Sequence, residues 1–175
     1  MLDIAAALAT SGIDYAVVGA MAAAVHGVVR ASLDADAVVS LQVRQAVALQ
    51  HTFDAAGLAT EFRIGDPDDP IPALLAITDS YGNRVDLLIG LRGLEPGAFA
   101  RAQHIAFLGE SLRIIGREDF IAMKAFAGGP QDLSDARLAI AFDRESLDLG
   151  LLRRLAERFG REAAKTLDEL LASGI

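Results

Sequence analysis

The sequence predicts an α+β fold in which a mixed β-sheet, flanked by helices, is followed by a helical C-terminal part. Over residues 1–116, short apolar runs of strand length alternate with segments of helical spacing, whereas residues 117–175 carry helical patterns alone. The chain has 175 residues, 53% of them hydrophobic, which is enough to bury a core without covalent staples. We therefore expect a single domain over residues 1–175, with a mixed core over 1–116 and a helical part over 117–175.

The first four elements are two helices and two strands. Leu2–Thr10 has helical character, and Gly12 suits the position just beyond the end of that helix. Tyr15–Val18 is a short apolar run typical of a buried strand, and the alanine-rich segment Met21–His26 favours a helix. A second strand is expected over Ala35–Ser40.

The alternation then continues into a hairpin. A helix over Gln42–Ala56 and a strand over Ala59–Ile64 are followed by residues 65–70, whose glycine, aspartate and proline content indicates a loop. Leu74–Thr78 and Arg84–Ile89 are predicted to pair as the strands of a hairpin.

A second hairpin is expected over His104–Leu108 and Leu112–Ile115, around a turn at Gly109 and Glu110. Beyond it the pattern becomes helical. The predicted helices are Glu118–Ala127, Asp132–Phe142, Asp148–Phe159 and Glu162–Ala172.

The composition excludes several kinds of site and surface. The sequence has no cysteine, so any metal must be held by oxygen or by histidine. Lys and Arg number 16 against 24 Asp and Glu, a net charge of −8, so the broad basic surface of a nucleic-acid-binding protein is missing, although an RNA acceptor at one local patch stays open. No segment resembles a signal peptide or a membrane-spanning helix, which predicts a cytoplasmic protein without a membrane partner.

Three aspartates stand at informative places. Asp34 and Asp36 are two residues apart at the start of a strand, so both side chains point to one face, with Cα atoms roughly 6.7 Å apart. Asp86 lies inside an apolar run, where an unpaired carboxylate is costly to bury. If the two strands are neighbours, three carboxylates meet, and their repulsion favours a divalent cation such as Mg²⁺. The alternative is that the Asp34–Asp36 pair merely forms a turn or cap.

A glycine connects the first predicted strand to the helix that follows it. Backbone amides near Gly19 and Ala20, at the N-terminus of that helix, are suited to hold a phosphate group. The alternative is an ordinary turn.

Two stretches carry a resemblance to a known family. Residues 15–39 resemble the opening of the nucleotidyltransferase superfamily, particularly the AbiEii-type toxins, and residues 84–88 are similar to its third acidic position. Residues 118–135 resemble a later block of the same family. The resemblance covers about residues 13–140 and implies a nucleotidyltransferase-like fold.

The resemblance also implies an activity, which is transfer of a nucleoside monophosphate from a nucleotide triphosphate with release of pyrophosphate. It implies that Asp34, Asp36 and Asp86 bind Mg²⁺ (or Mn²⁺) and that Asp86 helps to activate an acceptor hydroxyl. The positions implied for the nucleotide and its phosphates are Gly19, Ala20, Arg30, Ser32 and Lys124, with Asp132 and Asp135 as accessory candidates.

The residues by themselves leave other roles open for three of these side chains. Lys124 also suits a solvated helix position, Arg30 a pairing with a surface acid, and Asp132 a helix N-cap. The sequence departs from the family at Ala20, which replaces a second Gly or Ser, and at Gly129, which replaces an Arg. A hydrogen bond lost to a charged phosphate would weaken binding by roughly 1.5–3 kcal/mol.

Three functions follow as alternatives. The first is an active nucleotidyltransferase acting on a protein, an RNA or a small molecule, for instance as the toxin of a toxin–antitoxin pair. The second is a weakened member that acts by binding a protein partner, such as a toxin or an antitoxin. The third is a modifier of a cationic small molecule, similar to the aminoglycoside adenylyltransferases.

Overall fold

The computed structural model describes residues 1–32 and 34–173. Leu33, in the stretch 15–39 that carries the family resemblance, lies outside the described residues. The strands are Tyr15–Val17 (β1), Asp34–Val39 (β2), Ala59–Ile64 (β3), Ala73–Thr78 (β4), Arg84–Ile89 (β5), Gln103–Phe107 (β6) and Glu110–Ile114 (β7). The helices are Leu2–Thr10 (α1), Gly19–Val25 (α2), Ala46–Ala55 (α3), Ala98–Arg101 (α4), Arg117–Ala127 (α5), Pro130–Phe142 (α6), Leu149–Phe159 (α7) and Arg161–Ala172 (α8), with 3-10 turns at Val43–Gln45 (η1) and Arg144–Ser146 (η2).

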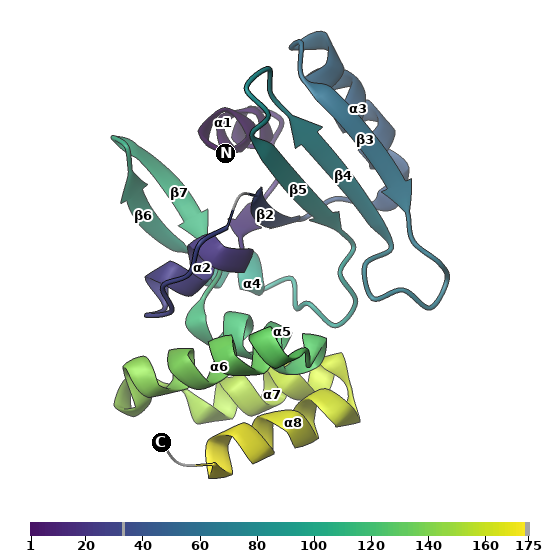
Figure 1. Ribbon diagram of the computed structural model, residues 1–175. Coiled ribbons are helices and arrows are strands. Elements are labelled where there is room, and N and C mark those ends of the chain that lie inside the picture. The colour runs from purple at the N-terminus through teal and green to yellow at the C-terminus, as the bar shows by residue number, and fades with distance from the viewer. Residues whose placement is uncertain (33, 174–175) are drawn as a thin grey trace.

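The strands form one mixed sheet, and the last helices form a layer beside it. The strand order in the seven-stranded sheet is β3-β4-β5-β2-β1-β7-β6. The two central strands, β2 and β5, run parallel, while β4 and β5 pair antiparallel as the predicted hairpin. Figure 1 shows α5 to α8 packed together below the sheet. The predicted α+β class, with a mixed sheet and a helical C-terminal part, is confirmed.

One face of the sheet is covered by α3. Gln50 of this helix donates to the hydroxyl of Thr60 at 3.1 Å, so α3 lies on the face to which Thr60 points. In the strand register Thr60 is opposite Ile77, which is opposite Val85, and both of these are buried on that face. Because side chains alternate along a strand, the neighbouring positions point to the opposite face, which is where the site described below is formed.

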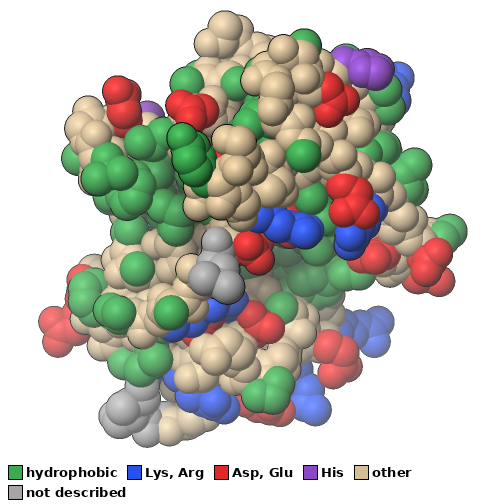
Figure 2. Space-filling model, turned by 45° about the horizontal axis from the view of Figure 1, so that its top comes forward, with side chains coloured by type: hydrophobic (Ala, Val, Ile, Leu, Met, Phe, Trp, Pro, Cys, Tyr) green, Lys and Arg blue, Asp and Glu red, His purple; other side chains and the backbone are tan. Residues whose placement is uncertain are grey.

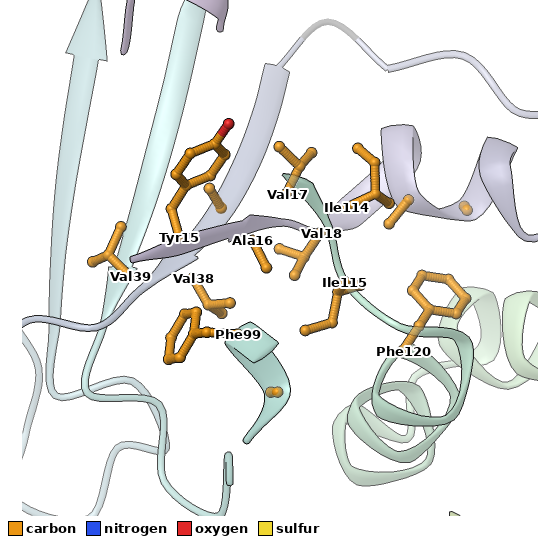
Figure 3. Packing of buried hydrophobic residues seen from close by; sticks show 14 of the residues in the cluster. Tyr15, Ala16, Val17, Val18, Val38, Val39, Phe99, Ile114, Ile115 and Phe120 are labelled. Carbon is orange, nitrogen blue, oxygen red and sulfur yellow. The ribbon is translucent and has the colours of Figure 1, made fainter. Parts of the chain in front are cut away.

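The hydrophobic core is continuous from the sheet into the helical part. A single cluster of buried side chains extends from Ile4 in α1 to Leu170 in α8. Figure 3 shows its centre, where β1, β2 and β7 meet α4 and the start of α5. His26 is buried there, 5.3 Å from the ring of Phe120, and its Nε2 donates to the carbonyl oxygen of Ile115 at 2.8 Å. His26 therefore ties the end of α2 to the link between β7 and α5.

Most predicted elements are present, with differences at a few ends. The predicted bounds of α1, β3 and β5 are those of the structure. The predicted helix over Gln42–Ala56 begins instead as the turn η1, and the four-residue helix α4 was not predicted. The turn of the second hairpin falls at Leu108 and Gly109, both with positive φ, rather than at Gly109 and Glu110.

Helix α6 begins earlier than predicted. Gly129 is its N-cap and Pro130 occupies the first turn, where a proline loses no hydrogen bond because the first amides of a helix have no partner within it. Asp132 lies inside the helix, and its alternative role as an N-cap is wrong.

In the described part of the chain, no helix is both long enough and apolar enough to cross a membrane.

Candidate active site

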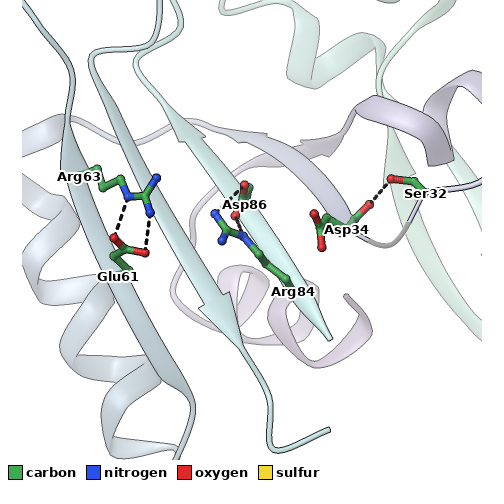
Figure 4. Close-up of polar contacts among 6 residues, drawn as sticks. All are labelled: Ser32, Asp34, Glu61, Arg63, Arg84 and Asp86. Carbon is green, nitrogen blue, oxygen red and sulfur yellow. Dashed lines mark hydrogen bonds and ion pairs between the residues drawn. The ribbon is translucent and has the colours of Figure 1, made fainter. Parts of the chain in front are cut away.

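The strand register brings the three aspartates together. In the parallel pair β2–β5, Asp36 is directly opposite Asp86, and Asp34 is opposite Arg84. Partners in such a register point to the same face, so all three carboxylates gather on the face opposite α3. Figure 4 shows Asp34 and Asp86 on these neighbouring strands. The predicted neighbourhood of the two strands is thus present.

Gly19 lies against the carboxylate of Asp36. It has a φ of +60° at the start of α2, and a Cβ atom added there would clash with Oδ2 of Asp36. The preceding amide, of Val18, donates to the carbonyl oxygen of Asp36 at 2.8 Å. Glycine is therefore required by both the left-handed backbone and the close approach of the acid.

The carboxyl group of Asp36 lies in surroundings that disfavour its charged form. Burial raises the pKa of its carboxyl above the usual value, and the neighbouring carboxylates of Asp86 and then Asp34 raise it further. The positive charges of Arg30 and Lys124 act in the opposite direction. Burial and the two neighbouring carboxylates together outweigh these positive charges, so the pKa of Asp36 stays raised.

Arg84 neutralises the third aspartate. Its Nε donates to Oδ1 of Asp86 at 2.7 Å and its Nη2 donates to Oδ2 at 3.2 Å, which is a two-pronged ion pair (Figure 4). The hydrogen bonds to Asp86 hold the pKa of Arg84 above its usual range. Among the described residues, no group of three or more His, Asp or Glu side chains is already arranged so that it could hold a metal ion.

A second polar cluster joins α5 and α6 to the loop before β2. Nζ of Lys124 lies 2.6 Å from Oδ1 of Asp132 and 3.1 Å from Oδ2 of Asp135, and Gln131 donates to Asp135 at 2.8 Å. Nε of Arg30 is 3.3 Å from the same Oδ2 of Asp135, which is completely buried. Lys124 is thus not a solvated side chain, and the partner of Arg30 is a buried acid, so both alternatives left open by the sequence are corrected.

An open cleft of about 570 Å³ lies beside Asp34, which lines it together with Arg84. Asp34, Arg84, Arg30 and Ser32 supply polar groups to its wall, and Ala20 contributes from α2. Its apolar lining comes from Met1, Leu2, Met21, Ala24, Phe107 and Leu108. Figure 2 shows acidic and basic side chains side by side across the middle of the molecule.

Ser32 makes a local contact in this structure. Its hydroxyl donates to the carbonyl oxygen of Asp34 at 3.0 Å, which positions the segment that leads into β2. The hydroxyl oxygen of Ser32 can still accept a hydrogen bond, but its hydrogen is already donated to Asp34.

Sequence reasoning missed Arg84 as a member of the site. Its spacing of two residues from Asp86 on a strand was the available signal, because that spacing puts both side chains on one face. The link between Arg30 and Asp135 joins residues more than 100 positions apart in the sequence, and no local pattern predicts it.

Comparison with known proteins gives no relative by sequence. No protein-family model matches the chain, and no curated protein matches it either.

Solved structures do share its fold. A nucleotidyltransferase-like protein from Paracoccidioides brasiliensis superposes with a TM-score of 0.57 at 16% identity, over 97% of this chain and 84% of that one. The antibiotic-resistance factor ANT(2'')-Ia superposes with a TM-score of 0.60 at 16% identity, over 98% of this chain and 94% of that one. Another structure of this factor, in complex with adenylyl-2''-tobramycin, superposes with a TM-score of 0.55 at 18% identity, over 89% of this chain and 92% of that one.

The lincosamide antibiotic adenylyltransferase LnuA, bound to lincomycin, superposes with a TM-score of 0.53 at 9% identity, over 81% of this chain and 94% of that one. At these identities the likeness is one of fold. The chain therefore has a nucleotidyltransferase-like fold, and its AbiEii-type character stays a prediction from the sequence.

Proposed function

We propose that this protein is an enzyme that transfers a nucleoside monophosphate group from a nucleotide triphosphate to an acceptor. The observation that carries the proposal is the register of β2 and β5, which sets Asp36 opposite Asp86 with Asp34 on the same face. The nucleotidyltransferase-like fold supports it, because solved proteins of this fold include adenylyltransferases. Fold alone does not establish an activity, so the proposal rests on the site.

The carboxylates suit a divalent metal. Asp34, Asp36 and Asp86 offer the hard oxygen donors that Mg²⁺ and Mn²⁺ prefer, and the chain has no cysteine to favour a softer ion. Burial, and then the neighbouring carboxylates of Asp86 and Asp34, raise the pKa of Asp36, and a bound cation would offset both effects. When bound, such metal ions stabilise the charge that develops on the phosphate oxygens and help to align the attacking and leaving groups.

The nucleotide is proposed to lie between α2 and the helical part. Gly19 lets the chain come close to the phosphates, and Ala20, on the wall of the cleft, offers its amide nearby. Arg30, Ser32 and Lys124 are the proposed polar contacts. Asp132 and Asp135 position Lys124 by holding its ammonium group, and they do not touch the phosphates in this proposal.

The reaction needs no covalent intermediate on the protein. The oxygen of an acceptor hydroxyl attacks the α-phosphorus, a new P–O bond forms, and the bond to the oxygen that bridges to the β-phosphorus breaks. Pyrophosphate leaves with that oxygen, and the hydroxyl proton passes to a carboxylate, for which Asp86 is proposed. Most of the acceleration comes from positioning and from charge stabilisation.

The acceptor is proposed to enter from the cleft beside Asp34. The cleft is of the size of a small-molecule site, and apolar side chains share its lining with Asp3, Asp34 and Asp79. Solved neighbours of the fold bind the antibiotic lincomycin or an adenylylated tobramycin, which supports a hydroxyl-bearing small molecule, with or without positive charge. A protein or an RNA acceptor, as in a toxin–antitoxin pair, is the competing choice.

A non-catalytic role is the second candidate. In this structure Lys124 and Arg84 are both engaged by carboxylates, and Ala20 and Gly129 lack the side chains of the resembling family. These features favour a weakened site in a protein that acts by binding a partner.

Labelled nucleotides separate the two candidates. The protein is incubated with Mg²⁺ and each of the four nucleotide triphosphates, labelled at the α- or the γ-phosphate, with pools of small molecules, RNA and protein from cells. Transfer of the α-label without the γ-label identifies nucleotidyl transfer. We expect Asp34→Asn to reduce it at least 100-fold, because the variant loses a charged metal ligand.

The control is Asp66→Asn, which removes one negative charge from the exposed loop between β3 and β4 and should leave transfer unchanged. Absence of α-label transfer to any of these pools, with every nucleotide, contradicts the proposed activity and favours the binding role. Equal transfer by Asp34→Asn and the wild type removes Asp34 from the mechanism.

A further inference from the structure

Strands β3 and β5, which lie on either side of β4, carry the same arrangement of an acid and an arginine. On β3, Nε of Arg63 lies 2.8 Å from Oε1 of Glu61, and Nη2 lies 2.8 Å from Oε2. On β5, Arg84 holds Asp86 with the same two nitrogens. In each pair the two residues are two positions apart and point to the face that carries the aspartates (Figure 4).

The two pairs differ in their surroundings. Arg63 and Glu61 are both more than half exposed, whereas Asp86 keeps only 18% of its side chain exposed and faces Asp36 across the β2–β5 pair. The guanidinium of Arg84 therefore supplies positive charge where three carboxylates converge. The guanidinium of Arg63 makes its ion pair with the exposed Glu61.

A guanidinium in this position competes with a metal ion. Both oxygens of Asp86 accept hydrogen bonds from Arg84, and a fixed positive charge beside them repels a divalent cation. For Asp86 to coordinate a metal, Arg84 must turn away. Space for this exists, because Arg84 also lines the open cleft beside Asp34.

We propose that Arg84 is an exchangeable counter-ion of the carboxylate site, which holds Asp86 while no metal is bound and sets the metal affinity of the site by competing for that carboxylate. This inference rests on the proposed function only in taking Asp34, Asp36 and Asp86 as the metal ligands. Arg84 is a positioning residue in this role, since it acts on the metal through Asp86. On metal binding its side chain moves into the cleft, where it meets the negative charge of Asp34 or of a phosphate.

Binding of Mn²⁺ alone tests the proposal without an acceptor or turnover. The free ion is followed by electron paramagnetic resonance in the wild type, Arg84→Gln and Arg63→Gln. We expect Arg84→Gln to bind Mn²⁺ roughly tenfold more tightly, because a charge-assisted pair at Asp86 no longer has to be broken. Arg63→Gln removes the same charge from a matched pair, and its affinity should change by less than about twofold because the charge is exposed and screened.

Asp86→Asn separates direct competition from a general effect of charge. In that background Arg84→Gln should tighten Mn²⁺ binding by less than about twofold, because the carboxylate for which the two cations compete is gone. Tightening of the same size in both backgrounds overturns the proposal.

The other outcomes are equally decisive. If the wild type binds Mn²⁺ and Arg84→Gln binds it equally or more weakly, the counter-ion role of Arg84 is wrong, while the metal site of the proposed function stands. If neither protein binds Mn²⁺, the metal site itself fails and the inference fails with it.

Should Arg84→Gln not fold, Arg84→Lys replaces it. This variant keeps the charge but loses the two-pronged geometry, so about threefold tighter binding is expected and unchanged binding overturns the proposal.

Discussion

The charge of Asp36 disfavours folding but suits the proposed binding of a cation. Its side chain is partly buried against Gly19, opposite Asp86 and on the same face as Asp34. These surroundings raise the pKa of Asp36, chiefly through burial and then through the two neighbouring carboxylates. A charge that is unfavourable in the metal-free protein becomes favourable when a cation arrives.

The raised pKa of Asp36 predicts a pH-dependent gain in stability for Asp36→Asn. Between the ordinary value of 3.8 and the raised value, the folded protein holds a proton that the unfolded chain has lost, so stability falls as pH rises through this window. Above the raised pKa the penalty is complete, and below 3.8 it is absent. Without metal, the free energy of unfolding of Asp36→Asn should exceed that of the wild type at pH 7, and the difference should shrink as the pH approaches 3.8.

Urea unfolding at several pH values, with a chelator present, measures this difference. A gain of equal size at all pH values, or a loss of stability at pH 7, would show that the charge of Asp36 is not the source of strain.

At the residue scale, the sequence predicted Asp34, Asp36 and Asp86 as a group because spacing and hydrophobic context are local properties. It left open the partners of Lys124 and Arg30, because their contacts depend on how α5 and α6 pack against the loop before β2. That packing is decided by tertiary structure.

The elements of the sheet are predictable where their pattern is strong. The alternation and the apolar runs gave β3, β4 and β5 and the hairpin between the last two. The sequence did not predict that β2 pairs with β5; the meeting of the three aspartates was predicted only on the assumption that these strands are neighbours. Pairing between strands that are distant in the sequence produces no local sequence pattern. Helix α4 has four residues, too few for a periodic pattern.

Arg101, at the end of α4, anchors the start of α5. Its Nε and Nη2 donate to the two oxygens of Asp119, at 2.9 and 2.8 Å, and its Nη1 lies 2.8 Å from Glu95. The side chain of Asp119 is only 2% exposed. A carboxylate this deeply buried depends on its partner for charge compensation.

Arg101→Ala is therefore expected to lower the free energy of unfolding by about 3 kcal/mol, because it leaves Asp119 buried without a cation. Arg153→Ala is the control. Its partner Asp168 is exposed and 3.6 Å away, and loss of such a surface pair should cost less than about 1 kcal/mol. Thermal or urea unfolding of both variants makes the comparison, and equal losses would contradict the anchoring role of Arg101.

For the whole molecule, we propose that the sheet and the C-terminal helices form one folding unit. One cluster of buried side chains includes residues of both parts, from Ile4 in α1 to Leu170 in α8. The ion pair between Arg30 and Asp135 joins the two parts beside the candidate site. The last strand, β7, ends at Ile114, and the helices α5 to α8 follow from Arg117. What composition and pattern could not predict is that the helical part supplies Lys124 to the surroundings of Asp36.

The central claim is that the three aspartates form a metal-dependent nucleotide site that both parts of the molecule complete. The most direct measurement is the melting temperature of the wild type and of Asp34→Asn with Mg²⁺ and each nucleotide triphosphate, alone and together. A ligand at 100 times its dissociation constant stabilises the folded state by about 2.7 kcal/mol, which raises the melting temperature by several degrees. We predict such a rise for the wild type with one nucleotide and Mg²⁺ together, and none for Asp34→Asn. No rise with any nucleotide at millimolar concentration, or the same rise in both proteins, would contradict the claim.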